Sequence, residues 1–423
     1  MKEKFQLIFY DLRHQPVVTW VTLIGTMLSV FLVMTMLMLE RMPSVPFAPE
    51  SNRPRMMKGA YLHTENMNSP GDNVYSGTIG SKTVRQLYDN LDGVERVSFM
   101  QHYVSSGTLL EGPTADMVSC ISRKADAEFF NIADHTLLKG RYYTKAEADA
   151  LAKVAVLTES TARKIFGDVE PVGASFLMNH ERYTCIGVIA DHSELAVNVY
   201  GDVFLPTSVS DNSNQWGPRH GEMAALLLLK PGTDPEYIRK QVKGRYAALN
   251  TELAQEESRA IYHESPYTVD EVPTGSNMSP DPNKKKAFVF QLLIYLLVPA
   301  INLSSMLHSR MRRRVSELGV RRAFGCTRTR IISDILNENL IVTLAGGILG
   351  FILSIIILSV YTGFMAGFTY TPLTGAIPLG ALINWGSVAW AFVLCLVLNI
   401  VSASLPAWQA SRLNPVNAIN ERK

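Results

Sequence analysis

Two short stretches of this sequence carry residue types that could do chemistry. Residues 77–83 approach the phosphate-binding pattern G-x-x-x-x-G-K-[ST], in which backbone amides and a lysine hold phosphate groups. Ser81 separates Gly80 from Lys82, and no apolar strand precedes the stretch, so we do not expect a nucleotide site there. Residues 191–194, Asp-His-Ser-Glu, are better explained as solvated loop residues than as a metal or catalytic site. Because G-x-S-x-G, H-E-x-x-H and C-x-x-C are also absent, the sequence predicts no catalytic, cofactor-binding or metal-binding residues.

The most unusual charged stretch is residues 312–330, which hold seven arginines and a single acid, Glu317. Anionic lipid headgroups would explain the arginines, but they do not explain Glu317, Gly319 or Gly325. Glycine inside a short helix costs up to about 1 kcal/mol relative to alanine, whereas it lets another backbone approach closely. Glu317 offers charge-assisted hydrogen bonds to a partner. We therefore predict a helix over 315–324, ended by Gly325, with Thr327 capping the next helix, and a role in docking another protein.

The elements around that stretch are strongly apolar. Only 18% of all residues are charged, and four windows contain no charged residue at all: 17–39, 287–307, 340–360 and 385–405. A membrane-spanning helix needs about 20 apolar residues, so each window is long enough. The first window is too long for a signal-peptide core and lacks a small-residue cleavage site, which favours an uncleaved anchor. The expected fold class is an α-helical membrane protein with four transmembrane helices and a large α+β extracytoplasmic domain between helices 1 and 2.

The charges predict how the chain is oriented. Residues 41–286 carry 26 basic and 31 acidic side chains, whereas the remainder is net basic. Cytoplasmic loops are enriched in lysine and arginine, so both termini and the arginine segment are expected inside. The predicted domains are the N-terminus with the first span (1–40), the outer domain (41–286), the second span (287–307), a cytoplasmic coupling segment (308–339), the third span (340–360), a short outer loop (361–384), the fourth span (385–405) and a cytoplasmic tail (406–423).

Alternating patterns predict the outer domain's mixed α+β character. Strands are expected at 154–157, 183–189, 203–205 and 225–229, and helices at 84–90, 125–130, 159–166 and 235–255. Proline-rich residues 42–49 and turn-rich residues 273–283 are interpreted as linkers. Cys120 and Cys185 fall in strand-like runs, where either a disulfide or two buried thiols would fit.

Three regions resemble one family. Residues 314–326, RVSELGVRRAFGC, are similar to the R-x-x-E-[IL]-G-[IV]-x-[RK]-A-[LF]-G-[AC] signature of MacB/FtsX-type ABC transporter permeases. Residues 153–173, 183–189 and 204–206 resemble the MacB-like periplasmic core, and residues 406–419 resemble the tail of the family. No ATPase sequence is recognised here, and in that respect the chain departs from MacB, so macrolide export itself is not carried over.

The resemblance implies a multi-pass inner-membrane permease that works as a homodimer or beside a related permease subunit. An ABC ATPase partner would bind ATP and Mg, and this chain would hold no cofactor. A periplasmic adaptor and an outer-membrane channel are further implied partners, the lipid bilayer surrounds the spans, and no nucleic acid is expected. The residues implied to contact the ATPase are Glu317, Leu318, Gly319, Arg321, Arg322, Ala323, Phe324 and Gly325.

Small and polar residues within the spans predict how the helices pack. Gly346 and Gly350 form a G-x-x-x-G pair, which suits either packing within the chain or a dimer. Gly25 and Ser29 of the first span are spaced likewise, and Pro299 should kink the second. Asn302 and Asn399 are expected to bond neighbouring helices. No acid lies within the four windows, which argues against a proton-coupled secondary transporter.

The sequence thus predicts a non-catalytic permease subunit. ATP hydrolysis on a partner would drive its periplasmic domain, a mechanism called mechanotransmission, for export or extraction of a cargo such as an antimicrobial, a peptide or a lipoprotein. One alternative is an FtsX-like regulator of an envelope hydrolase. The other is a receptor-like membrane sensor that signals through a cytoplasmic partner.

Overall fold

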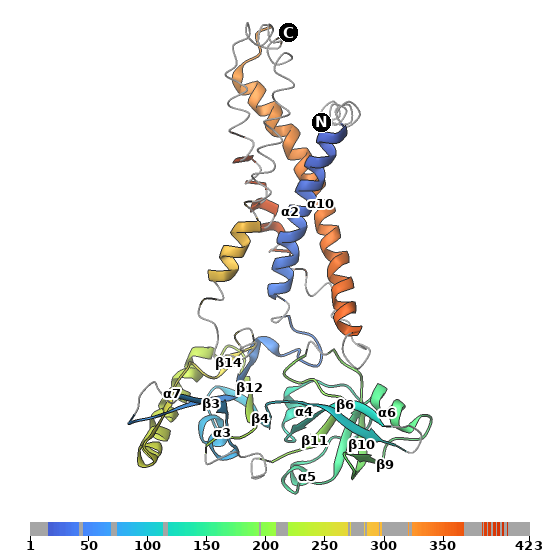
Figure 1. Ribbon diagram of the computed structural model, residues 1–423, viewed down its shortest axis with the longest axis vertical. Helices are drawn as coiled ribbons and strands as arrows, with labels where there is room; N and C mark the ends of the chain where they lie inside the picture. The colour runs from blue at the N-terminus through green and yellow to red at the C-terminus, as the bar shows by residue number, and fades with distance from the viewer. Residues whose placement is uncertain are drawn as a thin grey trace. The chain divides into compact units, whose positions relative to one another are not determined.

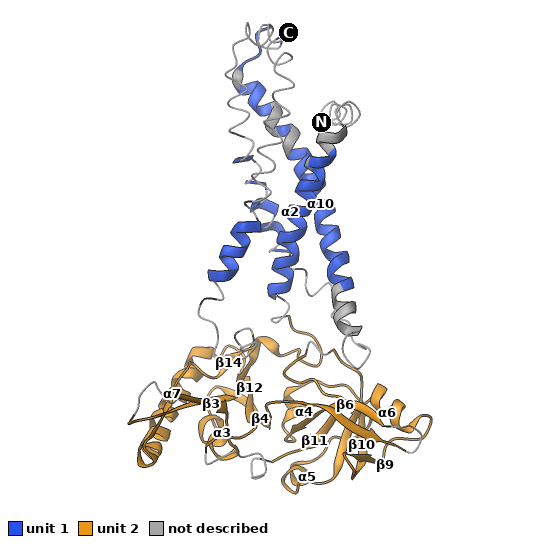
Figure 2. Ribbon diagram, in the orientation of Figure 1, with its two compact units in different colours: residues 1–42, 282–362, 382–423 blue, residues 43–281, 363–381 orange. Residues whose placement is uncertain are grey.

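The chain folds into two compact units, which are coloured separately in Figure 2. The computed structural model describes residues 16–41, 45–68, 74–112, 117–193, 196–208, 219–269, 286–295 and 324–367, with single residues and short runs besides. The helical unit comprises residues 1–42, 282–362 and 382–423, and the αβ unit comprises residues 43–281 and 363–381. Each unit is described below by itself.

One half of the αβ unit is a closed ring of strands, here called the ring lobe. Around the ring each strand pairs with the next in the order β11, β8, β10, β9, β5 and β6, and β6 pairs back onto β11. The β8–β10 and β11–β6 pairs are parallel and the others are antiparallel. The strands are β5 (Ser105–Glu111), β6 (Val118–Ala125), β8 (Val154–Thr158), β9 (Ser175–Met178), β10 (Glu181–Ile189) and β11 (Val203–Pro206).

The ring lobe encloses an apolar core. Its strands alternate between buried and more exposed residues, which places one face of each strand inside. Helix α6 (Glu159–Phe166) adds Ile165 and Phe166, both fully buried, to the core of strand residues. Smaller elements complete the lobe: α4 (Phe129–Ile132), β7 (Leu137–Gly140), which pairs with β10, and α5 (Lys145–Asp149).

The other half is an open sheet with helices on one face, here called the open-sheet lobe. Its strands run in the order β4 (Val94–Gln101), β12 (Met223–Leu229), β1 (Met56–Gly59) and β14 (Tyr267–Thr268), all antiparallel. A second sheet has the order β13 (Ser258–Ile261), β2 (Tyr61–Asn66) and β3 (Val74–Thr78). The two lobes share strand pairing only where Met100 of β4 meets Ala125 of β6, among the described residues.

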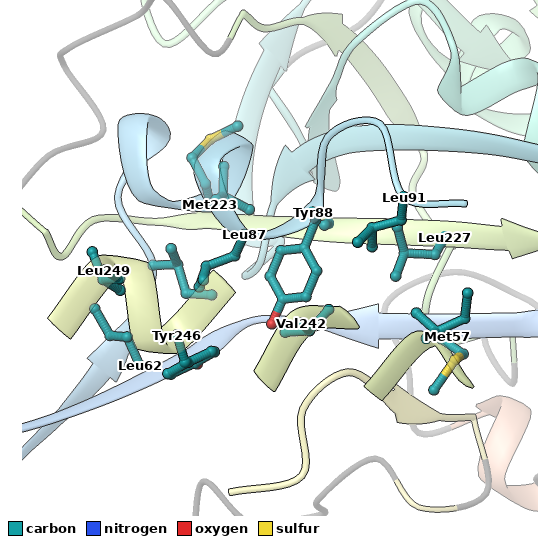
Figure 3. Packing of buried hydrophobic residues seen from close by; sticks show 14 of the residues in the cluster. Met57, Leu62, Leu87, Tyr88, Leu91, Met223, Leu227, Val242, Tyr246 and Leu249 are labelled. Carbon is teal, nitrogen blue, oxygen red and sulfur yellow. The ribbon is translucent and has the colours of Figure 1, made fainter. Parts of the chain in front are cut away.

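Helices α3 (Ser81–Tyr88) and α7 (Pro235–Leu253) cover one face of the open sheet. Figure 3 shows labelled side chains from both helices meeting those of β1, β2 and β12 in one cluster. Ile238, Val242, Tyr246, Leu249 and Leu253 line the buried stripe of α7, at the spacing expected for an amphipathic helix. Asp234 accepts a hydrogen bond from the amide of Glu236 (3.0 Å) and so caps the start of α7.

The helical unit contains two described helices that are long and apolar enough to cross a membrane. They are α2 (Pro16–Arg41), through Leu23–Glu40, and α10 (Arg328–Gly367), through Leu340–Val360 (Figure 1). A shorter apolar helix occupies Lys286–Tyr295 and covers the first part of the predicted second span. Of the rest of that span only Leu297 is described, and the predicted fourth span is described in short helical runs, so the number of spans stays a prediction.

Most expected elements of the αβ unit are confirmed, and two expectations are wrong. The four strands and the helices at 159–166 and 235–255 are present, and α3 begins three residues earlier than expected. The helix expected at 125–130 is not formed as such, because Ala125 ends β6 and α4 begins only at Phe129. Asp126 lies between them and accepts hydrogen bonds from the amides of Phe99 and Phe129 (2.8 and 3.2 Å), which ends the strand and starts the helix.

The proline-rich stretch at 42–49 is also not a loose linker in its described part. Val45 and Phe47 are buried, and the guanidinium carbon of Arg53 lies 4.6 Å from the centre of the Phe47 ring. The amide of Glu50 donates to the carbonyl of Phe47 at 2.6 Å, closing a tight turn. The chain is therefore packed into the αβ unit only a few residues after α2 ends at Arg41.

Candidate functional site

The predicted docking segment is described at its C-terminal end. The amide of Phe324 donates to the carbonyl of Val320 at 3.1 Å, which is the last turn of a helix. Gly325 follows with φ of +88°, the left-handed conformation that only glycine adopts without strain. The sequence prediction that Gly325 ends this helix is confirmed. Residues 317–319 and 321–323, named as contacts for the ATPase, lie outside the described residues.

A new helix starts almost immediately after this turn. Thr327 accepts a hydrogen bond from the amide of Arg330 through its hydroxyl (3.4 Å) and one from the amide of Ile331 through its carbonyl (3.2 Å). That pattern is an N-cap, as predicted, and it satisfies donors that the first turn of a helix leaves free. Only Gly325 and Cys326 separate the last helical turn of the segment from the cap of α10. The ring of Phe324 is 88% exposed at this corner.

The small residues of α10 face α2 of the same chain. A Cβ atom placed on Gly346 would collide with the side chain of Thr26, and one on Gly350 would collide with the carbonyl oxygen of Met27. On the next face, a Cβ on Gly347 would lie 2.6 Å from the ring of Phe392. The glycines therefore let two helix backbones approach closely within one chain. We call this contact between α2 and α10 the helix seam.

The predicted packing residues of α2 lie on the same helix, and their hydroxyl groups bond locally. Ser29 donates to the carbonyl of Gly25 at 2.5 Å, and Thr26 donates to the carbonyl of Leu23 at 2.9 Å. Such bonds to the preceding turn satisfy a hydroxyl group without a partner helix. A role for Gly25 and Ser29 in a dimer stays a prediction, and Pro299, Asn302 and Asn399 lie outside the described residues.

Away from the seam, α10 presents an apolar face that nothing in the described chain covers. The exposed side chains recur every four residues in a stripe that winds slowly around the helix: Leu344, Ile348, Ile352, Ile356 and Val360. A water-soluble protein rarely exposes a continuous stripe of this kind, whereas lipid tails solvate it well. The seam and the stripe together are what a membrane-spanning helix requires when it packs on neighbouring helices along one side and faces lipid on the other.

The two outer-domain cysteines are buried free thiols. Cys120 of β6 and Cys185 of β10 both belong to the core of the ring lobe, and neither forms a disulfide. Burial raises the pKa of the Cys120 thiol to about 12 and that of Cys185 to about 11. A protonated thiol is a poor nucleophile, so both behave as core residues. The described residues contain no group of three or more His, Cys, Asp or Glu side chains suited to a metal ion.

From sequence, residues 191–194 are interpreted as solvated loop residues, but the described part of this stretch makes specific contacts. Asp191 accepts a hydrogen bond from the amide of Ser160 at the start of α6 (2.9 Å). The ring of His192 lies 4.6 Å from that of His135, centre to centre, and burial lowers the pKa of His192 to about 4. The described part of this loop therefore has a structural role that its polar composition conceals.

Comparison with known families accounts for both units. The model for the MacB-like periplasmic core domain matches residues 19–245, and the model for the FtsX-like permease C-terminal region matches residues 289–415. The chain belongs to the MacB/FtsX type of ABC transporter permeases. The large α+β unit is thus the MacB-like periplasmic core, and the arginine segment and α10 lie in the FtsX-like region.

Individual relatives of this MacB/FtsX-type permease are distant. It is 23% identical to the macrolide export ATP-binding/permease protein MacB of Mannheimia succiniciproducens, over 82% of this chain and 52% of that protein. It is 24% identical to the pyoverdine export ATP-binding/permease protein PvdT of Pseudomonas savastanoi pv. phaseolicola, over 70% of this chain and 42% of that protein. The chain therefore spans about half the length of the curated relatives it matches.

Two solved structures are also similar to part of the permease. The periplasmic region of MacB from Actinobacillus actinomycetemcomitans matches 56% of this chain and 99% of that structure, with 17% identity and a TM-score of 0.37. A domain of a permease protein from Porphyromonas gingivalis matches 56% of this chain and 97% of that structure, with 16% identity and a TM-score of 0.38. These scores are low, and the family assignment rests on the two family models.

Proposed function

We propose that this chain is the permease subunit of an ABC exporter and that ATP hydrolysis on a partner chain drives movements of its periplasmic domain. Membership of the MacB/FtsX type supports the permease role, and the exporter names of the relatives support export. The proposal includes four membrane spans, cytoplasmic termini, and a homodimer or a pair with a related permease subunit. It also includes a periplasmic adaptor and an outer-membrane channel as partners.

The observation that carries this proposal is the continuity of α10. The helix runs for 40 residues from the capped turn at Thr327 to Gly367. At 1.5 Å per residue it is about 60 Å long, roughly twice the thickness of the hydrocarbon core of a bilayer. The part before the apolar window, from Arg328 to Leu340, accounts for about 18 Å. A displacement applied at the docking segment would therefore pass into the membrane along one unbroken helix.

The helix seam would transmit the displacement to α2. Because Gly346 and Gly350 allow backbone contact, α10 cannot shift along its axis without moving Thr26 and Met27. Helix α2 ends at Arg41, and Val45 is already buried in the αβ unit. A connection this short leaves little slack for the chain to absorb a movement. Movement of α2 would thus reach the periplasmic core directly.

A reconstituted complex tests this function. The permease and its co-purified ATPase would be placed in lipid nanodiscs, and ATP turnover would be measured for the wild type, Glu317→Lys and Asp168→Lys. Reversing the charge at the docking segment should lower permease-dependent turnover at least ten-fold. The control makes the same change at an exposed turn of the ring lobe and should keep wild-type turnover.

Three results would contradict the proposal. Equal turnover in Glu317→Lys and the wild type would remove the docking role. ATP hydrolysis by the isolated chain would remove the need for a partner. Cysteine labelling of position 326 from the periplasmic side would place the segment on the wrong face. Co-purification with a kinase in place of an ATPase would favour the sensor alternative.

A further inference from the structure

Two cations are buried in the αβ unit without a carboxylate partner among the described residues. Lys58 of β1 is 7% exposed and Arg123 of β6 is 2% exposed. Neither belongs to any of the ion pairs of the described chain. Moving an unpaired charge out of water is among the most costly events in folding, so a protein rarely keeps two such charges without a use for them.

Both cations belong to the face of the open sheet that α3 and α7 do not cover. Met57 lies in the core beneath those helices, so its neighbour Lys58 points to the opposite face. Arg123 lies two residues before Ala125, the one residue of β6 that pairs with β4, and its Nη1 is 3.7 Å from Sδ of Met100. The two side chains therefore come from different lobes and lie on one face near the joint between them, where the charge of Arg123 acts on Lys58.

The guanidinium of Arg123 is held only by neutral groups. Its Nε donates to the carbonyl of Tyr200 at 2.6 Å, and its Nη2 donates to the carbonyl of Val197 at 3.2 Å. Arginine has five N–H donors, so the three contacts named here leave two of them available. For the ammonium group of Lys58, the described residues supply no hydrogen-bond acceptor. Burial, followed by the charge of Arg123, lowers the pKa of Lys58 to about 7.

The buried Glu50 and Asp202 and the half-buried Asp126 of the same region are already engaged elsewhere. Glu50 pairs with Nε of Arg53 at 2.5 Å and accepts from the amide of Asn198 at 2.9 Å. Asp126 accepts from the hydroxyl of Ser98 and from two backbone amides. Asp202 accepts from the amide of Ile121 at 2.8 Å and from the hydroxyl of Tyr200 at 3.1 Å. Burial lowers the pKa of both Lys58 and Arg123 and the charge of Glu50 acts in the opposite direction, but its carboxylate is engaged by Arg53 and Asn198 and forms no ion pair with either cation.

A third polar group of this region, the Nδ1 atom of His102, also lacks a hydrogen-bond partner among the described residues. His102, just after β4, shares a hydrogen bond of 3.0 Å between its Nε2 and the hydroxyl of Tyr61, whereas its buried Nδ1 has no partner in the described chain. Burial, and then the charges of Lys58 and Arg123, lower the pKa of His102 to about 2. The imidazole is therefore neutral. If Tyr61 donates to Nε2, the ring proton is on Nδ1, which can then donate to a ligand.

We propose that Lys58, Arg123 and the Nδ1 of His102 form a binding site for an oxyanion, the carboxylate or phosphate group of a small molecule, at the joint between the two lobes. The ligand supplies the negative charge and the acceptors that this face of the sheet lacks. Because one cation comes from each lobe, the bound anion also holds the lobes together. The site is independent of the ATPase partner and of the docking segment.

Thermal unfolding of the full-length permease in detergent tests the site. Inorganic phosphate and sodium acetate are the probes, each titrated against sodium chloride at equal ionic strength. A saturable rise in the unfolding temperature with phosphate, acetate or both supports the site and identifies the preferred anion. Lys58→Met should weaken the apparent affinity at least ten-fold. Lys230→Met, the same change at an exposed lysine after β12, should leave the affinity unchanged.

A second measurement keeps the test decisive if Lys58→Met does not fold. The wild-type protein is treated with formaldehyde and cyanoborohydride, and methylation of each lysine is followed by mass spectrometry. The preferred anion should slow methylation of Lys58 at least five-fold and leave that of Lys230 unchanged. No saturable stabilisation by either probe, equal stabilisation of Lys58→Met and the wild type, or equal methylation of Lys58 with and without the anion overturns the proposal.

Discussion

The two units of this permease keep their shape by different means. The αβ unit buries large side chains such as Phe166 and Phe204 and holds many of its buried polar groups, such as the carboxylates of Glu50 and Asp202, with specific hydrogen bonds. The helical unit (Figure 2) instead brings two backbones together at Gly346 and Gly350, and α10 leaves its opposite face apolar and exposed. Water drives the first kind of packing, since it expels apolar surface, but lipid provides no such force between apolar helices.

This difference teaches which substitutions each unit should tolerate. In the αβ unit, a smaller side chain leaves a cavity and buries less apolar surface, and both effects lower the free energy of unfolding. In the helical unit, adding volume at the seam separates the helices, whereas removing volume from the lipid-facing stripe changes little. The following predictions either sharpen this contrast or break it.

The largest expected effect is loss of volume in the open-sheet core. Leu227 of β12 is fully buried, so Leu227→Ala should lower the free energy of unfolding of the αβ unit by about 2–5 kcal/mol. The matched change Leu349→Ala, at a residue of α10 that is 44% exposed, should cost less than about 0.5 kcal/mol. Urea unfolding followed by hydrogen exchange of each unit measures both. Equal costs would break the comparison.

Adding volume at the seam should have the next largest effect. Gly346→Val places methyl groups where Thr26 lies, and overpacking of this kind costs about 1–3 kcal/mol. Ala345→Val adds similar volume on an exposed face of the same helix and serves as the control. Disulfide cross-linking between cysteines placed at Val30 and Phe351, which belong to one apolar cluster, reports helix contact without adding volume at a glycine. An unchanged cross-linking rate in Gly346→Val would show that the seam is not close-packed.

The pH dependence of the αβ unit should reveal the buried Lys58. Its folded pKa is lowered from 10.5 to about 7, mainly by burial, so between these values the unfolded chain binds a proton that the folded chain does not. Stability should therefore rise with pH from about 7 to about 10.5, by at most about 1.4 kcal/mol per pH unit.

Unfolding midpoints measured over this pH range in anion-free buffer check the sign of this effect. Lys58→Met should remove this rise in stability, and Lys230→Met should keep it. A wild-type midpoint that does not change with pH would mean that Lys58 is not an unpaired buried cation.

The smallest expected effects concern helix caps. Thr144 and Glu147 form a reciprocal capping box at the start of α5, so Thr144→Ala should cost about 1 kcal/mol. Thr327 caps α10 through a longer bond of 3.4 Å, and Thr327→Ala should cost less. Local hydrogen exchange at residues 145–149 and 328–332 measures the fraying of each helix. A larger cost for Thr327→Ala than for Thr144→Ala would show that the start of α10 depends on its cap more than the 3.4 Å hydrogen bond suggests.

Local patterns allowed much of the fold to be predicted. The strand at 203–205 and the helix at 159–166 were found because their apolar spacing and flanking turn residues are local signals. The helix expected at 125–130 was wrong because the side chain of Asp126 captures backbone amides on both sides, and its partner Phe99 is distant in sequence. The turn at Gly325 and the cap at Thr327 were predicted because both depend on a single residue's own chemistry.

The candidate anion site could not have been predicted in the same way. Lys58 follows Met57 in an ordinary strand, and Arg123 precedes Lys124, with no motif that joins them. Sequence placed both in a solvated outer domain, where isolated cations need no explanation. Only the pairing of β1 with β12, of β12 with β4 and of β4 with β6 brings the two to one face.

The sequence by itself determined that this chain has charge-free windows long enough to span a membrane, a mixed α+β domain and a strongly basic segment between two of the windows. Those properties follow from composition or from the spacing of residues close together in sequence, so they do not depend on the tertiary structure. The tertiary structure alone decided that Gly346 faces Thr26, that the ring of strands closes from β6 to β11, and that two cations share one buried face. Each of these depends on contacts between residues far apart in sequence, because burial and charge act on whatever the fold brings together.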